Sequence, residues 1–220
     1  GLLTRAWCPP NPEDPRVTSP GGWRYTASMS AALRAVPATY ADIEALAPNL
    51  VGEIVNGELY ASPRPAFPHV NAGSVLGVEI GGPFHRGRGG PGGWWILDEP
   101  ELHLHDDVLV PDLAGWRRER MPRLPRGVGV VLPPDWVCEV LSPSTARLDR
   151  AAKMPVYARE GVEWLWLVDP IARMLESYRL HEGRWLQIAV HAGNGSVRVE
   201  PFEAIELDLW AQWGEDGPEG

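Results

Sequence analysis

Four side chains in the middle of the sequence could bind a metal or act in acid–base chemistry. Asp112 ends the apolar run Val108-Leu-Val-Pro-Asp112, and Glu139 lies inside the apolar run Trp136-Val-Cys-Glu-Val-Leu-Ser142. A strand that is buried on both faces excludes charge, so a carboxylate within it needs a metal, a cation or hydrogen-bond donors. If the two strands are neighbours, Asp112 and Glu139 can share one Mg²⁺ or Mn²⁺ ion, because these hard cations prefer oxygen ligands. The alternative is that each acid pairs with an arginine from residues 117–126.

Asp149 and Lys153 follow at a spacing of four residues, which places them on one face of a predicted helix. An ordinary surface ion pair explains this spacing equally well. In the functional alternative, Lys153 points toward a metal-activated water, where its ammonium group orients the nucleophile or offsets negative charge that develops on phosphorus.

Three other positions have weaker signals. Glu53 lies on the first arm of a predicted hairpin, where a solvated surface position is the better interpretation from the sequence alone. His69 follows Pro68 and either caps a helix or lies at the mouth of a cleft. His103 and His105 alternate beside Asp106-Asp107, which favours a solvated strand edge over a metal pair. No G-x-S-x-G, P-loop, H-E-x-x-H or C-x-x-C motif is present.

The hydrophobic pattern predicts the elements that position these residues. The predicted order is helix, hairpin, helix, three strands, strand, helix, strand and hairpin, which indicates an α/β or α+β domain with a mixed sheet. Asn56-Gly57 between two apolar arms is a strong hairpin signal, because a type I′ turn needs positive φ at both positions. The predicted ranges are a helix at 40–47, a hairpin at 51–61, a helix at 69–85, strands at 94–97, 101–105, 108–116 and 135–142, a helix at 146–160 kinked at Pro155, a strand at 163–169, and a hairpin formed by 173–180 and 184–191.

Charge limits the classes of partner that the chain can bind. The formal net charge of −9 is a poor match to a phosphate backbone, so any nucleic-acid contact needs a local basic patch. Such a patch is predicted in the long loop at 117–134, together with Arg86 and Arg88. The predicted nucleic-acid-binding residues in this loop are Arg117, Arg118, Arg120, Arg123 and Arg126.

Composition also predicts the domain organisation. Residues 1–28 are rich in Pro, Gly and Arg without periodicity, so we expect a flexible leader followed by a single domain at 29–220, and Met29 is a candidate start residue. The two cysteines favour a reducing cytoplasm. No window resembles a secretory signal or the ~20 apolar residues of a membrane span, so no membrane association is expected.

Several of these segments together resemble a known family. They are Val-Pro-Asp112-Leu-Ala, Cys-Glu139-Val-Leu-Ser-Pro-Ser-Thr145, Asp149 with Lys153 and Tyr157, Gly161-Val162, Trp166-Leu-Val-Asp-Pro170, and, upstream, Glu53-Ile-Val-Asn-Gly-Glu-Leu59 with His69. They resemble the large bacterial family of Uma-type putative restriction endonucleases, within the PD-(D/E)XK nuclease superfamily. The resemblance covers about residues 40 to 209, and the block from Glu139 to Pro170 is its most specific part.

The resemblance implies a restriction-endonuclease-like core, with a mixed central sheet flanked by helices, and a divalent metal, Mg²⁺ or Mn²⁺. It makes Asp112 and Glu139 metal ligands, with the Val140 carbonyl as a third, and Glu53 the acidic residue from the N-terminal region. One departure matters: the main superfamily pattern has lysine two positions after the second acid, where this chain has Leu141. The family is thought to use a lysine from the following helix, which here is Lys153.

The function that we expect is a Mg²⁺-dependent endonuclease acting on DNA, as a cytoplasmic homo-oligomer, with Glu53, Asp112, Glu139 and Lys153 as catalytic residues. His69 and Asp149 are candidate accessory residues. Two alternatives stay open at this point: a non-catalytic, oligomeric binding or accessory protein on a nuclease scaffold, and an enzyme that hydrolyses a small phosphoester. A metal titration distinguishes the first of these from the endonuclease, because a bound ion raises stability by mass action.

Overall fold

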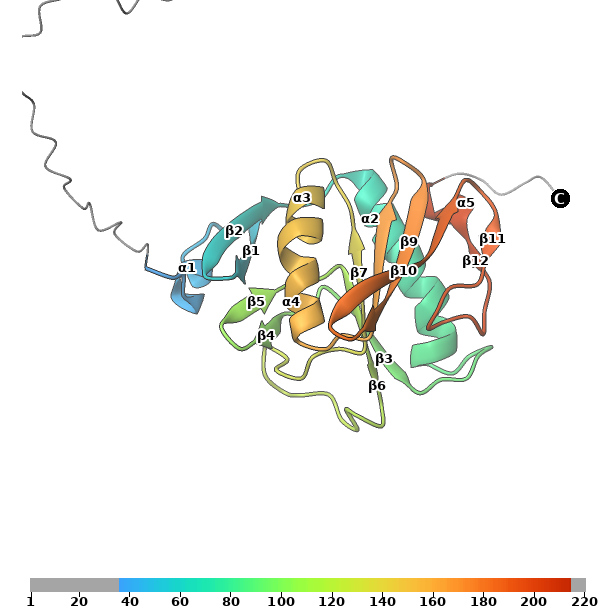
Figure 1. Cartoon of the computed structure of the whole chain (residues 1–220), viewed down its shortest axis with the longest axis horizontal. Coiled ribbons are helices and arrows are strands. Elements are labelled where there is room, and N and C mark those ends of the chain that lie inside the picture. The colour runs from blue at the N-terminus through green and yellow to red at the C-terminus, as the bar shows by residue number, and fades with distance from the viewer. Residues whose placement is uncertain (1–35, 215–220) are drawn as a thin grey trace, which may run out of the picture. The chain divides into compact units, whose positions relative to one another are not determined.

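The computed structural model describes residues 36–214, and the predicted leader at 1–28 lies outside the described residues. Two sheets and a small strand pair make up the fold (Figure 1). No helix in the described part of the chain is long and apolar enough to cross a membrane.

The larger sheet has six strands in the order β10-β9-β8-β7-β6-β3. Strands β7 and β8 pair in parallel and every other pair is antiparallel, so the sheet is mixed, as predicted. The bounds are β3 (Trp94–Asp98), β6 (Leu113–Arg117), β7 (Trp136–Val140), β8 (Trp164–Asp169), β9 (Met174–His181) and β10 (Arg184–Ala192). Strand β6, which follows Asp112, pairs with β7, which carries Glu139, and Leu113 is opposite Cys138. The prediction that these two strands are neighbours is confirmed.

The second sheet has four strands in the order β2-β1-β5-β4. The bounds are β1 (Leu50–Val55), β2 (Glu58–Pro63), β4 (Leu102–Leu104) and β5 (Asp107–Leu109). Asn56 and Gly57 have φ angles of 53° and 80°, which confirms the predicted hairpin turn. Helix α1 (Tyr40–Glu44) precedes this sheet and begins at a capping box between Thr39 and Asp42.

The single strand predicted at 108–116 is wrong. The segment divides into β5, which belongs to the four-stranded sheet, and β6, which belongs to the six-stranded sheet. Pro111 lies in the break, and a proline has no N–H to donate to a sheet ladder, so the strand cannot continue through it. As a result β4 pairs with β5 but β3 pairs with β6, and Asp112 lies where the two sheets meet.

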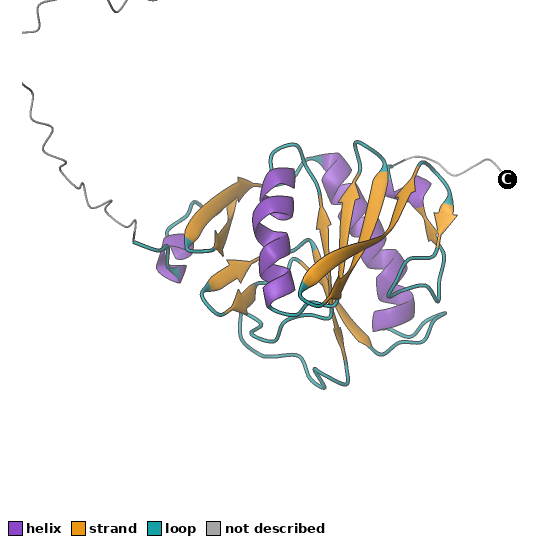
Figure 2. Ribbon diagram, in the orientation of Figure 1, coloured by secondary structure: helices purple, strands orange, loops and turns teal. Residues whose placement is uncertain are grey.

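Helices cover both faces of the six-stranded sheet (Figure 2). Successive side chains of β7 alternate between two hydrophobic cores. Cys138 and Val140 pack in the core that contains Leu76 of α2 (Phe67–Ile80). Val137 packs in the core that contains Tyr157 of α4 (Met154–Arg159). Glu139 has the same parity as Val137, so it points toward the layer that holds α4.

The two long helices both contain a widened, π-helical turn. Helix α2 continues into η1 (Gly81–His85), and the predicted helix at 146–160 consists of α3 (Ala146–Leu148), η2 (Asp149–Lys153) and α4. Pro83 lies inside η1, and Pro155 is the second residue of α4. A proline ring clashes with the carbonyl four residues earlier, and a wider turn moves that carbonyl away. The predicted kink at Pro155 therefore takes the form of a π turn that contains both Asp149 and Lys153.

Short elements at the C-terminal side of the described residues pack beside α2. Strands β11 (Ser196–Val197) and β12 (Leu207–Asp208) pair with each other, and α5 (Leu209–Gln212) follows. The Asn71 side-chain amide of α2 donates hydrogen bonds to the carbonyls of Ala211 and Gln212.

Candidate active site

A small polar cavity of about 70 Å³ lies where the two sheets meet the helix that contains η2. Five carboxylates line it, together with one histidine and one lysine: Glu53, Glu99, Asp112, Glu139, Asp149, His69 and Lys153. A cavity of this size is large enough to hold water. The candidate residues predicted from β1, β7 and the following helix are therefore brought to one place.

Lys153 lies at the centre of this group. Its Nζ is 2.8 Å from Glu53 Oε1, 2.8 Å from Glu139 Oε1 and 3.6 Å from Asp149 Oδ1, and its side chain is 3% exposed. Burial alone would lower the pKa of Lys153, but the surrounding Glu139, Tyr157, Glu53 and Asp149 raise it well above its ordinary value. The lysine therefore carries a charge that its acidic neighbours hold in place.

Glu139 is as deeply buried as the lysine, with 3% of its side chain exposed. Its Oε1 accepts hydrogen bonds from the Lys153 ammonium group and from the hydroxyl of Tyr157, the latter at 2.6 Å. Burial raises the pKa of Glu139 well above its ordinary value, Lys153 opposes this shift, and the charges of Asp149, Asp112 and Glu53 add to it. Oε2 has no hydrogen-bond partner among residues 36–214, so one oxygen is available for a ligand.

Glu53 and Asp149 are buried, although a surface position was considered for both. Glu53 is buried, and its Oε1 accepts hydrogen bonds from the Val110 N–H at 2.8 Å and from Lys153. Asp149 is also buried, and burial raises its pKa to about 6 although Lys153 opposes the shift. The solvated position considered for Glu53, and the surface ion pair considered for Asp149 and Lys153, are both wrong.

Asp112 is fixed by two contacts at the rim of the cavity. Its Oδ2 accepts the Val140 N–H at 2.6 Å, and its Oδ1 lies 3.2 Å from His69 Nε2. Burial alone would lower the pKa of His69, but the hydrogen bond to Asp112, together with the charges of Asp112, Asp149 and Glu99, raises it. His69 therefore lies at the cavity, as one of its two interpretations predicted, and not at a helix cap, since α2 begins before it.

The charges in the cavity fit a hard cation. Five carboxylates face one lysine and one histidine, so negative charge remains uncompensated, and carboxylate oxygens are the ligands that Mg²⁺ and Mn²⁺ prefer. Among residues 36–214, no three acidic, histidine or cysteine side chains are placed to hold one ion together. Mg²⁺ does not need three, because it keeps several waters and binds through one or two carboxylates. Asp112 and Glu139 both line the cavity, and with the Val140 carbonyl they stay the predicted ligands.

Three of the five predicted DNA-contacting arginines make contacts within the protein. Arg117 lies over the ring of Trp164, Arg118 donates to the carbonyls of Trp94 and His85, and Arg120 pairs with Asp135. Arg123 and Arg126 are exposed. Strand β6 runs from Asp112 toward Arg117, so the start of this loop is roughly 16 Å from the acids, at about 3.3 Å per residue. None of these arginines neutralises Asp112 or Glu139 within the described residues.

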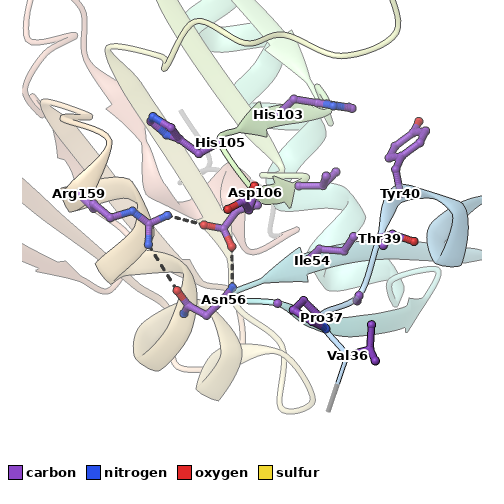
Figure 3. A pocket seen from close by; sticks show the side chains of 14 residues that line it. Val36, Pro37, Thr39, Tyr40, Ile54, Asn56, His103, His105, Asp106 and Arg159 are labelled. Carbon is purple, nitrogen blue, oxygen red and sulfur yellow. Dashed lines mark hydrogen bonds and ion pairs between the residues drawn. The ribbon is translucent and has the colours of Figure 1, made fainter. Parts of the chain in front are cut away.

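A larger cavity of about 950 Å³ lies elsewhere, beside α1 and the β1–β2 hairpin (Figure 3). Its lining includes His103, His105 and Asp107. Asp107 pairs with Arg159 and accepts the Asn56 N–H at 2.5 Å, while His105 contacts Glu160 at 2.9 Å. Asp107 and His105 are thus both paired, and among residues 36–214 no group of three or more His, Cys, Asp or Glu side chains is placed to hold a metal ion here.

Tyr157 and Glu99 are site residues whose position the residue pattern did not predict. Tyr157 lies four residues after Lys153 and eight after Asp149, so helical spacing on the same face was the signal that could have identified it. Glu99 follows β3 with a φ of 43°, and no sequence pattern marks it.

Comparison with known proteins identifies a family and a similar fold. The model of the family Uma2, described as "putative restriction endonuclease", matches residues 37–210. A crystal structure of a putative nuclease belonging to DUF820, from Anabaena variabilis, is similar in fold, with a TM-score of 0.64 and 22% sequence identity. The match covers 81% of this chain and 98% of that one. No curated protein matches the chain.

Proposed function

The chain belongs to the Uma2 family, and from this premise we propose that it is a metal-dependent endonuclease that hydrolyses DNA phosphodiester bonds. The observation that carries the proposal is a buried lysine held 2.8 Å from two buried glutamates, in a cavity that Asp112 also lines. Lone carboxylates and ammonium groups are costly to bury, so a buried cluster of them that lines a cavity supports a functional site.

The proposed ion is Mg²⁺ or Mn²⁺, with Asp112, Glu139 and the Val140 carbonyl as ligands. When bound there, it would polarise a phosphoryl oxygen and lower the pKa of a water. The protein's part is to keep the ligand oxygens in position. Tyr157 and Lys153 occupy Oε1 of Glu139 and leave Oε2 free, while the Val140 N–H and His69 hold Asp112.

Lys153 supplies positive charge at a fixed position. Its ammonium group is already desolvated and charged before the substrate binds, so no reorganisation is needed when negative charge grows on the phosphoryl oxygens. Glu53 and Asp149 hold the lysine in place. The role that we propose for Glu53 is therefore to position Lys153.

DNA is the proposed substrate. Contact between DNA and the loop at 117–126 stays a prediction, and Arg123 and Arg126 are the arginines of this loop that are exposed for it. Assembly into a homo-oligomer and a cytoplasmic location likewise stay predictions from the sequence.

The test is nicking of supercoiled plasmid by the wild-type protein with Mg²⁺, with Mn²⁺ and with a chelator. We expect nicking with either metal and none with the chelator. Asp112→Asn should reduce the rate by about 10²-fold or more, the typical cost of one electrostatic group at such a site. No nicking by the wild type with either metal, or equal rates for Asp112→Asn, would contradict the proposal and favour the non-catalytic alternative. A metal-dependent increase in thermal stability of the wild type, lost in Asp112→Asn, separately tests ion binding.

A further inference from the structure

A second groove, of about 470 Å³, lies beside the acid cavity between β2 and the helix that begins at Ala146. Thr145 lines both the groove and the acid cavity, so the two are neighbours. The volume falls within the ~300–1,000 Å³ typical of small-molecule sites, which is the size class of a nucleotide.

The groove has the opposite charge character to its neighbour. Five carboxylates line the cavity, whereas no acidic side chain lines the groove. The one charged lining residue is Arg147, which is exposed and has no ion pair or hydrogen bond through its side chain within residues 36–214. Ser62 and Ser144 add hydroxyl groups, and Ser144 Oγ is 2.9 Å from Ser142 Oγ. An unpaired guanidinium group with hydroxyls beside it suits a phosphate.

The rest of the groove is apolar and includes an aromatic ring. Ala61, Leu148, Ala151 and Ala152 contribute aliphatic surface. Tyr60 is half-buried in the wall, and its hydroxyl donates to Glu58 Oε2 at 2.8 Å, which fixes one end of the ring. Aromatic side chains stack with nucleobases of any identity, and aliphatic surface covers their faces.

We propose that this groove binds the nucleotide adjacent to the scissile phosphate, with Arg147 and Ser144 contacting a phosphate and the base lying against Tyr60 and Leu148. The proposal rests on the proposed function, since it takes the acid cavity as the place of cleavage. It separates the charges of the substrate complex: the cation occupies the acidic cavity, and the neighbouring phosphate of the same strand occupies the cationic groove. It also gives this acidic chain one cationic contact for DNA beside the acid cavity.

The test is binding of a short, fluorescently labelled single-stranded DNA, followed by anisotropy in chelator so that no cleavage occurs. Arg147→Gln should weaken binding at low salt and reduce the slope of log affinity against log salt by about 0.7, the effect of losing one phosphate contact on a single strand. Arg147→Lys should keep the slope, because the charge remains. Arg184→Gln is the matched control: it removes the same charge from an exposed arginine on β10, an edge strand of the other sheet that does not line the groove, and should change neither quantity.

A second pair of variants tests the stacking part. Tyr60→Ala should lower the affinity at least about five-fold, the lower limit for one stacked base, whereas Tyr60→Phe should retain it. The proposal is overturned if Arg147→Gln binds like the wild type, if Arg184→Gln loses as much, or if Tyr60→Ala and Tyr60→Phe bind equally. The proposed function is judged separately: DNA bound through Arg147 but never cut would refute catalysis alone, and metal-dependent cutting with unchanged Arg147→Gln would refute the groove alone.

Discussion

Replacing Lys153 by methionine should destabilise the protein strongly at alkaline pH and much less at acidic pH. Methionine keeps the length and much of the apolar volume of the lysine side chain but removes its charge. In the native protein the ammonium group lies 2.8 Å from Glu53, 2.8 Å from Glu139 and 3.6 Å from Asp149. Its loss leaves three buried carboxylates facing one another without compensation.

The expected loss at about pH 8 is roughly 3–5 kcal/mol, the cost of removing one partner from a buried ion pair. This is a large part of the ~5–15 kcal/mol by which domains are stable, so the loss is readily measured. Burial raises the pKa of Glu139, and that of Asp149 to about 6, and Lys153 lowers both, so both pKa values rise further without it. An acid whose pKa is higher in the folded than in the unfolded state contributes stability at pH values below its unfolded-state pKa. That contribution is lost as pH rises through its folded-state pKa. Near pH 5 the buried acids take up protons and become neutral, so they no longer need the positive charge of Lys153.

The assay is urea-induced unfolding at about pH 8 and about pH 5, with the free energy of unfolding compared between variants. Arg147→Met is the matched control: it lies on the same helix but is exposed, so its change should stay within about 0.5 kcal/mol. The double variant Lys153→Met/Glu139→Gln should recover part of the loss, because it removes one of the unpaired charges. A loss below about 1 kcal/mol at the higher pH, as for a surface pair, or an equal loss at both pH values, would refute the reasoning.

Three further predictions concern the same cavity. Tyr157→Phe should lower the free energy of unfolding by about 1.5–3 kcal/mol, since it removes a hydrogen bond to a buried carboxylate; a change below about 0.5 kcal/mol in urea unfolding would contradict this. In the wild type the raised pKa of Asp149, from 3.8 to about 6, makes the protein lose stability as pH rises from about 4 to about 7. Asp149→Asn has no such group, so its free energy of unfolding should increase relative to the wild type over this range, by up to roughly 3 kcal/mol. A difference that does not change with pH would contradict this. Mg²⁺ at 100 times its dissociation constant should stabilise the wild type by about 2.7 kcal/mol but leave Asp112→Asn unchanged, and equal shifts in thermal unfolding would show that the ion binds elsewhere.

Much of the fold could be predicted because its signals are local. Asn56-Gly57 fixes a hairpin turn by backbone conformation alone, and the short apolar run that contains Cys138 favours a buried strand. The strand at 108–116 was mispredicted because apolar runs continue on both sides of Pro111, and hydrophobicity does not report that the two halves enter different sheets.

The site could be predicted in part. Asp112 and Glu139 stand out because charge is rare in buried runs, and the spacing of Asp149 and Lys153 places them on one helix face. Glu53 is also the only charged residue of its strand, Leu50–Val55, but one face of a hairpin arm is often solvated, so this contrast did not identify it as buried. Its burial depends on a lysine 100 positions later in the chain, held by the π turn before Pro155. Contacts between segments so far apart follow from tertiary packing, which local pattern does not encode.

The most direct test of the central claim is metal-dependent nicking of supercoiled plasmid by Glu139→Gln, compared with the wild type at equal folded concentration. Glutamine can still accept the Tyr157 hydrogen bond, and Lys153 keeps Glu53 and Asp149 as partners. Comparison at equal folded concentration therefore isolates the loss of the negative charge beside Lys153 from any loss of stability. The account predicts nicking by the wild type with Mg²⁺ or Mn²⁺ and a loss of about 10²-fold or more in the variant. Undiminished nicking by Glu139→Gln would contradict it.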